Sequence, residues 1–276
     1  MVDIGNFTST SFEIFDINLV QKEVDGGSVS ADQIDKTIGS APNARSIVIS
    51  GLKQDTFDYF IKQYGKQFEA ISFWKNRLVE DLSPLCKLND IKYINCFSNQ
   101  KAASLWDMSG NKALTGLSIY DFSRLHNIEE IETAPNLEFF GLGNQVWAGM
   151  TIDSLKPVAN TKIKHFEWYG KTVSDNDYKC LAQGMIEVLD INPTRFTLDE
   201  LTDLLALFPE TLSGSITKPY VSGSVGTKGS VEHTTYRYLC KNKKACVVGK
   251  DDERFQNYLK DFEALLKTKR DQNISL

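Results

Sequence analysis

Residues 68–78 read FEAISFWKNRL, and the first six of them follow the pattern apolar-x-x-apolar-x-apolar. The same six-residue pattern recurs along the chain, and its seven copies start at residues 44, 68, 91, 114, 137, 163 and 186. Successive starts are therefore 24, 23, 23, 23, 26 and 23 residues apart. A period this regular indicates a chain built from stacked repeats.

Each copy predicts a short β-strand, because its fourth and sixth positions are apolar and share one side of an extended chain. One strand cannot bury its apolar side alone, so we expect the strands to stack in parallel on a common core. The sixth position of the third copy is Cys96, and its thiol is therefore expected to be buried. The expected strands start near residues 46, 70, 93, 116, 139 and 165.

The pattern and the period resemble the leucine-rich repeat, L-x-x-L-x-L-x-x-N/C-x-L. Residues 68–78 match every position, with Phe at two leucine positions and Asn76 at the asparagine position. The next copy has Asn99 there but Lys101 in place of a leucine, and later copies carry Phe122, Gln145, Lys171 and Thr194.

The resemblance covers about residues 44–196. It implies an α/β fold, namely a curved leucine-rich-repeat solenoid. A parallel β-sheet would line its concave face, and helices or 3-10 turns would line its convex face. It implies little about function, because this architecture serves many unrelated roles.

The segments between the strands differ in type. Residues 55–64 carry apolar side chains at helical spacing, which predicts an amphipathic helix with Asp55 as N-cap and Gly65 at its end. Residues 198–208 predict a second such helix. Pro84 lies among leucines that are three residues apart, which favours short 3-10 turns.

We divide the chain into three parts. Residues 1–43 are expected to form an N-terminal cap with a helix near 31–39, and residues 44–212 hold about seven repeats. Residues 213–276 are expected to form a C-terminal cap, although a separate small domain is the alternative. Within it we expect a Gly/Ser-rich loop over 213–230, strands at 234–239 and 245–248, and a final helix from residue 251 or 252.

Composition narrows the class of protein. The chain has 41% apolar and 24% charged residues and a net charge of −5, which argues against a dedicated nucleic-acid binder. No apolar run is long enough to span a membrane. The N-terminal sequence MVDIGNFTST is unlike a secretory signal, unless one has been removed. We therefore expect a cytoplasmic protein without nucleic-acid or membrane partners.

The residues that could carry chemistry are sparse. Five cysteines at irregular spacing, without a CxxC pair, indicate reduced thiols and no disulfide. Three histidines lack zinc-ligand spacing, so no metal or cofactor is predicted. No serine, cysteine or carboxylate lies in a recognisable catalytic motif. We therefore expect a non-catalytic protein.

The outward positions of the repeats carry the strongest functional signal. Positions three, five, seven and eight should face the concave surface, where an aromatic ladder is followed by an acidic and polar patch. We call these side chains the predicted binding face. Its residues are Trp74, Tyr93, Asn95, Phe97, Tyr120, Asp121, Phe139, His165, Glu167, Tyr169 and Asp190.

Exposed aromatic side chains often mark recognition surfaces. The first hypothesis is a recognition protein that binds another protein through this face, and the immunity partner of a toxin is one variant of it. The second is a glycan or small-ligand binder that stacks its ligand on the aromatic ladder. The third is an enzyme with a site at the acidic end. Alternatively, the aromatic rings pack only on each other as cross-strand pairs.

Overall fold

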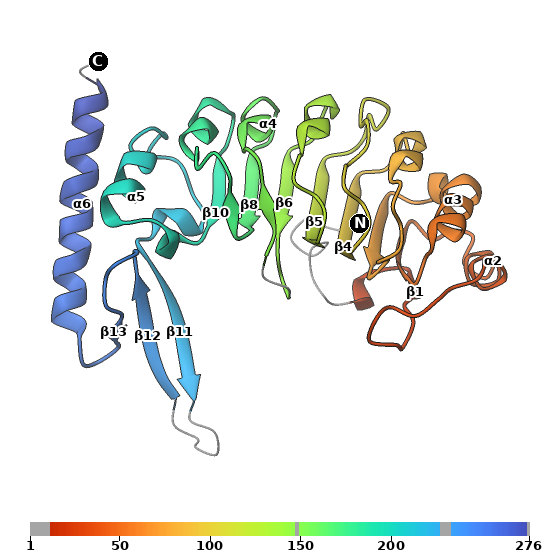
Figure 1. Ribbon diagram of the computed structural model, residues 1–276, viewed down its shortest axis with the longest axis horizontal. Coiled ribbons are helices and arrows are strands. Elements are labelled where there is room, and N and C mark those ends of the chain that lie inside the picture. The colour runs from red at the N-terminus through yellow and green to blue at the C-terminus, as the bar shows by residue number, and fades with distance from the viewer. Residues whose placement is uncertain (1–11, 147–148, 227–232, 275–276) are drawn as a thin grey trace. The chain divides into compact units, whose positions relative to one another are not determined.

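The computed structural model describes residues 12–146, 149–226 and 233–274. These form two compact units, residues 1–185 and residues 186–276, and each is described by itself. Both units contain helices and strands, and the first unit holds a large parallel sheet (Figure 1).

The first unit is built on a row of parallel strands joined by short helical segments. Its 3-10 turns are η1 (Phe12–Ile14), η2 (Gly65–Gln67), η3 (Ser83–Lys87), η4 (Glu129–Thr133) and η5 (Lys179–Gln183). Its helices are α2 (Ala31–Gly39), α3 (Gln54–Gln63) and α4 (Lys156–Ala159). Its strands are β1 (Ile17–Leu19), β2 (Ser46–Ser50), β3 (Ala70–Trp74), β4 (Tyr93–Asn99), β5 (Gly116–Phe122), β6 (Phe139–Gly143), β7 (Thr151–Ile152), β8 (His165–Tyr169) and β9 (Thr172–Val173).

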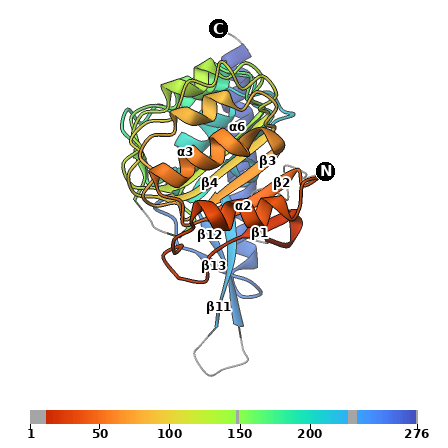
Figure 2. The ribbon, with the colours of Figure 1, turned by 90° about the vertical axis from the view of Figure 1, so that its right-hand side faces the viewer.

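The main sheet of this unit follows chain order, β1-β2-β3-β4-β5-β6-β8, and every adjacent pair is parallel. The predicted strand starts at 46, 70, 93, 116, 139 and 165 are confirmed to the residue. Figure 1 shows the arrowheads of β4, β5 and β6 at one edge, which we call the strand-end edge. Figure 2 looks along the row from its N-terminal end, with α2 and α3 nearest the viewer.

Equivalent repeat positions lie side by side, as the period predicts. Ile71 pairs with Ile47 on one side and with Ile94 on the other. The fourth and sixth positions are buried in every one of these repeats, which confirms the predicted side of each strand. The buried pairs are Ile47 and Ile49, Ile71 and Phe73, Ile94 and Cys96, Leu117 and Ile119, Phe140 and Leu142, and Phe166 and Trp168.

Two buried asparagines connect neighbouring repeats through their side chains. Asn76 donates from Nδ2 to the Ile49 carbonyl and accepts at Oδ1 from the Leu52 amide. Asn99 donates to the carbonyls of Asn76 and Val79 and accepts two amides of its own loop, from Lys101 and Ala102. A side-chain amide can satisfy donors and acceptors together, which a buried loop requires.

The end of each early strand turns in the same way. The eighth repeat position has positive φ at Gly51 (73°), Lys75 (53°), Ser98 (62°) and Asp121 (57°). Only glycine adopts this left-handed conformation without cost, so the other three residues are held there by the repeat. The turn redirects the chain and places the following residues at the strand-end edge.

The connections agree with most of the sequence-based expectations. Helix α3, Gln54–Gln63, matches the predicted 55–64 segment within one residue at each end, and η3 contains Pro84 as expected. The predicted Asp55 N-cap is wrong, because the helix begins at Gln54 and Lys53 is the capping position. The hydroxyl of Thr56 accepts the Lys53 amide at 3.0 Å and stabilises this start.

The second unit contains a helical part and a small antiparallel sheet. Its elements are β10 (Val188–Ile191), η6 (Pro193–Arg195), α5 (Leu198–Leu205), η7 (Ser215–Thr217), β11 (Tyr220–Gly226), β12 (His233–Leu239), β13 (Cys246–Val247) and α6 (Asp252–Ile274). The side chain of Thr197 caps α5, and the Glu200 carboxylate accepts the Thr197 backbone amide. The helix at 198–208, the strands at 234–239 and 245–248, and the final helix are confirmed within a few residues.

One expectation for this unit is wrong. The Gly/Ser-rich segment 213–230 was expected to be a loop, but β11 occupies Tyr220–Gly226 and pairs along its whole length with β12. Cross-strand partners such as Ser224 and Thr235, whose hydroxyls lie 3.0 Å apart, compensate for the weak strand preference of glycine. Residues 227–230 lie outside the described residues. The compact units divide at 185/186 rather than at 212/213, and the assignment of caps stays a prediction.

Candidate functional site

The predicted binding face is less exposed than its sequence suggests. Phe97 is 4% exposed and Tyr120 is 1% exposed, and Phe139, Asn95 and Asp121 are also buried. The expectation that these five side chains are accessible is therefore wrong. Trp74, Tyr93, His165 and Glu167 are half-buried, and Tyr169 is exposed. Asp190 is half-buried on β10 of the second unit, where it accepts the Ser215 amide at 2.8 Å.

The N-terminal segment covers the first part of this face. Phe12 lies edge-on to Trp74, with ring centroids 4.9 Å apart, and Phe15 is buried against Val48 and Ala70. Trp74 in turn stacks on Phe97 at 4.2 Å. The aromatic ladder is therefore partly a self-packed layer, as the cross-strand alternative predicted. The apolar side chains at 12–15 were the signal for this cover.

Further along the sheet, Tyr120 reaches across a whole strand. Its hydroxyl donates to Glu167 Oε2 at 2.6 Å, although Tyr120 is on β5 and Glu167 is on β8. Gly141 lies between them on β6, and a Cβ at that position would collide with the Tyr120 hydroxyl. The absent side chain lets the ring lie down along the sheet, which buries it.

Glu167 also contacts a histidine. Its Oε1 lies 3.7 Å from His165 Nε2, and the His165 ring meets Phe139 edge-on at 4.9 Å. Burial, with the carboxylate of Glu167 beside it, raises the pKa of Tyr120 well above its usual value. Tyr120 therefore keeps its proton at neutral pH and holds Glu167 in place. Tyr120 and Glu167 were expected in two separate patches of the predicted binding face, but a hydrogen bond connects them.

A polar row lies beneath these rings at the fifth repeat position. Asn95 donates to the Ser72 hydroxyl at 2.9 Å, while its Oδ1 is buried without a partner among the described residues. These side chains are covered, so they do not offer a ligand an accessible surface.

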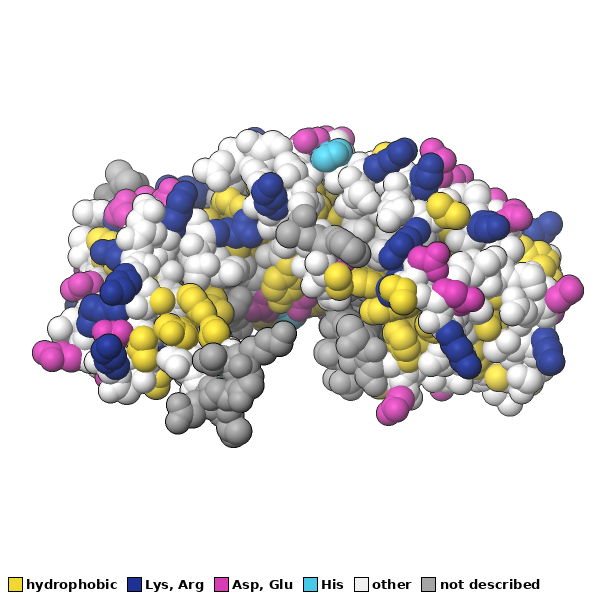
Figure 3. Space-filling model, turned by 60° about the horizontal axis from the view of Figure 1, so that its bottom comes forward, with side chains coloured by type: hydrophobic (Ala, Val, Ile, Leu, Met, Phe, Trp, Pro, Cys, Tyr) yellow, Lys and Arg dark blue, Asp and Glu magenta, His cyan; other side chains and the backbone are white. Residues whose placement is uncertain are grey.

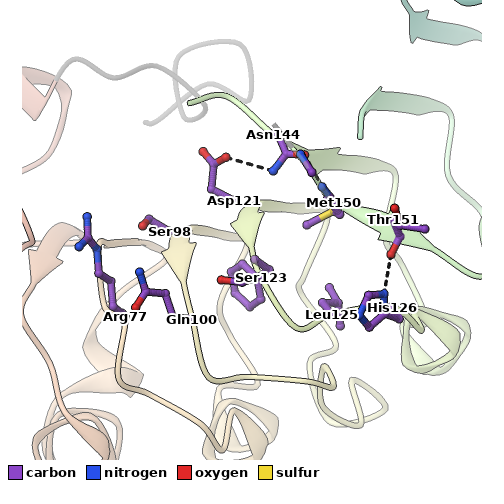
Figure 4. A pocket seen from close by; sticks show the side chains of 12 residues that line it. Arg77, Ser98, Gln100, Asp121, Ser123, Leu125, His126, Asn144, Met150 and Thr151 are labelled. Carbon is purple, nitrogen blue, oxygen red and sulfur yellow. Dashed lines mark hydrogen bonds between the residues drawn. The ribbon is translucent and has the colours of Figure 1, made fainter. Parts of the chain in front are cut away.

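An accessible concave feature of this unit lies at the strand-end edge (Figure 4). It is a pocket of about 450 Å³, which we call the strand-end pocket. It belongs entirely to the first unit. Its lining residues are Arg77, Ser98, Gln100, Asp121, Phe122, Ser123, Leu125, His126, Asn144, Gly149, Met150 and Thr151.

The repeat itself builds the polar side of this pocket. Arg77, Gln100 and Ser123 are 23 residues apart and occupy the tenth position of three successive repeats. Ser98 and Asp121 occupy the eighth position, where the left-handed turn points the chain toward the edge. In Figure 4, Arg77 and Gln100 stand on one side of the pocket, and Leu125 and His126 stand on the other.

Asp121 is committed to the neighbouring loop. Its carboxylate accepts the Asn144 side-chain amide at 3.2 Å and the backbone amides of Gln145 and Val146. Asn144 in turn accepts the amides of Gly149 and Met150 at Oδ1. The Asp121 predicted to bind a partner therefore shapes one wall of the pocket.

His126 is fixed on the far wall. Its Nδ1 lies 2.8 Å from the Thr151 carbonyl. A carbonyl only accepts, so we assign the proton to Nδ1, which leaves Nε2 as the free nitrogen. Of the pocket residues, sequence analysis singled out only Asp121 as a site residue; the 23-residue spacing of Arg77, Gln100 and Ser123 could have indicated the others.

Comparison of the sequence with protein-family models and with curated proteins finds no match. Among the described residues, no helix combines the length and the apolar character needed to cross a membrane.

Proposed function

We propose that the protein is a non-catalytic recognition protein with a leucine-rich-repeat scaffold, and that it binds another protein. The parallel strands at a period near 23 residues and the buried Asn76 and Asn99 support the scaffold. In such a scaffold the sheet forms the concave face of a curved solenoid. The side chains at strand ends then vary without cost to the core.

The observation that carries the proposal is a set of exposed apolar side chains at the strand-end edge. Leu78 is 52% exposed, Val146 is 65% exposed and Tyr169 is 44% exposed. All three follow or end a strand of the same parallel sheet. Figure 3 brings this edge forward and shows hydrophobic side chains among charged ones. Apolar and aromatic side chains supply much of the contact area at the core of protein interfaces.

The recognition surface proposed here lies at the strand-end edge and not in the middle of the predicted binding face. Trp74, Tyr93 and Tyr169 keep accessible surface and can still contribute. Phe97 and Tyr120 cannot serve as a stacking platform for a sugar while they are buried. The glycan alternative therefore loses the feature on which it depended.

The test is affinity purification of the tagged protein from its native cells, with identification of co-purifying proteins. The double variant Leu78→Asp, Val146→Asp should lose the specific partner, because two charges would be placed in the interface core. A matched variant with Lys62→Asp and Gln63→Asp, at exposed positions of α3, should retain it. Retention by both variants would refute the proposed edge.

A further inference from the structure

We propose that the strand-end pocket binds a carboxylate group joined to an apolar body. The inference concerns a site that the proposed protein interface does not require. The carboxylate could belong to a free organic acid or to the end of a peptide, and both would present the same chemistry.

Arg77 lines the pocket with a guanidinium that no described residue pairs. Its Nε is buried and has no hydrogen-bond partner among the described residues. A buried donor without a partner is uncommon in folded proteins and calls for an explanation. A guanidinium offers a planar fork of donors that matches a carboxylate in a bidentate pair.

The hydroxyl of Ser98 is a second polar group in the pocket. Ser98 is only 4% exposed, lines the same pocket and forms no side-chain hydrogen bond to another described residue. It sits in a left-handed turn at φ 62°, so the repeat holds it in this unusual position. The exposed side-chain amide of Gln100 lies beside it in Figure 4. Together they offer further donors near Arg77.

The carboxylate of Asp121 also lines the pocket. Asp121 could have neutralised Arg77, but its two oxygens accept amides of residues 144–146 instead. Hydrogen bonds from amides stabilise its charge where it stands. Asp121 therefore does not neutralise Arg77, and the guanidinium can pair with the carboxylate of a ligand.

The pocket also has an apolar lining. Phe122, Leu125 and Met150 are buried in the fold and also line the pocket. Leu125 and Met150 lie across the pocket from Arg77 and Gln100 (Figure 4). A pocket with apolar lining and a few convergent polar groups is the usual form of a small-ligand site. Its volume of about 450 Å³ suits a body of several carbons.

The experiment is a titration of the full chain, isotopically labelled, followed by amide NMR shifts. The probes are octanoate, 1-octanol, acetate, and acetyl-Leu-Leu with either a free carboxylate or a carboxamide end. Octanoate, with about ten non-hydrogen atoms, should bind at ordinary ligand efficiency with a Kd of about 10 mM or tighter. We expect octanoate or the peptide acid to shift the amides of Ser98, Gln100 and Ser123. The tighter of the two identifies the source of the carboxylate.

Neutral and truncated probes should bind at least about ten-fold more weakly, because each lacks half of the recognised chemistry. The variant Arg77→Gln should weaken acid binding about ten-fold or more and leave its thermal unfolding unchanged, since the Nε of Arg77 has no hydrogen-bond partner among the described residues. Arg124→Gln is the matched control, because Arg124 is exposed and does not line the pocket.

Three outcomes would overturn the proposal. One is the absence of shifts at the pocket residues with either acid. Another is equal binding of octanoate and 1-octanol. The third is an Arg77→Gln variant that stays folded and binds the acid as well as the parent protein. None of these outcomes would bear on the protein interface, which is tested through Leu78 and Val146.

Discussion

The hydroxyl of Tyr120 donates to Glu167 Oε2 at 2.6 Å across the intervening strand, and Gly141 is the residue that makes this reach possible. One hydrogen bond thereby links three successive repeats of the sheet. It also explains why a large aromatic residue at an outward position is buried.

The Tyr120–Glu167 bond predicts two linked losses of stability. Tyr120→Phe should cost about 1.5–3 kcal/mol, because it removes a hydrogen bond to a carboxylate. Gly141→Ala should cost about 1–3 kcal/mol, because the new Cβ displaces the Tyr120 ring. Urea unfolding measures both. Gly39→Ala is the control and should be neutral, since a Cβ at Gly39 meets nothing within 4 Å. Equal behaviour of Gly141→Ala and Gly39→Ala would contradict the packing described.

The burial of Phe97 predicts that it acts as a core residue. Phe97→Ala should lower the free energy of unfolding by about 3–5 kcal/mol, as large-to-small changes at buried aromatic sites do. From its outward repeat position alone, a loss within about 1 kcal/mol would be expected. Chemical denaturation distinguishes the two values. Tyr169→Ala, at an exposed position of the same repeat slot, should stay near the smaller value.

The buried asparagines predict a position-specific cost. Asn99→Ala should destabilise the protein by about 3 kcal/mol or more, because two carbonyls and two amides lose their partner. Asn136→Ala is the matched control, since Asn136 makes one exposed bond, to the Lys112 carbonyl. Its loss should be about 1 kcal/mol or less. Similar values for the two variants would argue against the role given to Asn99.

A pH effect is predicted where Asp35 on α2 meets two tyrosines. The hydroxyls of Tyr64 and Tyr59 both donate to Asp35 Oδ1 at 2.7 Å, and they lower the pKa of Asp35 from 3.8. The same bond raises the pKa of Tyr59 to about 12. A lowered folded-state pKa means that this stabilisation is present above pH 3.8 and is lost as the pH falls through the folded-state value.

The corresponding variant is Asp35→Asn, measured by thermal unfolding between pH 2.5 and pH 7 (about the range in which carboxylates titrate). At pH 7 it should unfold at a lower temperature than the parent, and the difference should shrink as the pH falls below about 4. A constant difference for Asp35→Asn across the range would refute the assignment.

The thiols predict an order of reactivity. Burial raises the pKa of Cys96, whereas Cys86 is half-buried on η3, and all five cysteines are free thiols. A thiol reagent should therefore label Cys86 in the native protein and reach Cys96 only through unfolding. Mass spectrometry of timed samples measures this. Early labelling of Cys96 would mean that its strand is shifted by one residue.

The period of the sequence was sufficient to predict the strands and their inward residues. Positions such as Ile71 and Phe73 are set by the alternation of one strand, and the repeat carries that alternation to the next. Local patterns also predicted α3 and η3. These features depend on residues close in the sequence, where periodicity is informative.

The burial of the outward positions could not be predicted in this way. It depends on Phe12 and Phe15 covering Trp74 and its neighbours, and on the missing side chain of Gly141. Both are contacts between distant segments. The strand-end pocket is similar, because the spacing of Arg77 and Gln100 is visible in the sequence but the opposite wall at Met150 is not.

Site-specific photo-crosslinking tests directly whether the strand-end edge recognises a partner protein. A photoreactive amino acid is placed at Val146 in one protein and at Lys62, exposed on α3, in another. We expect the photoreactive group at Val146 to crosslink one protein reproducibly and the group at Lys62 not to do so. Excess parent protein should abolish the crosslink, while excess Leu78→Asp, Val146→Asp protein should not. Equal crosslinking from both positions, or equal competition by the variant, would show that this edge is not the recognition surface.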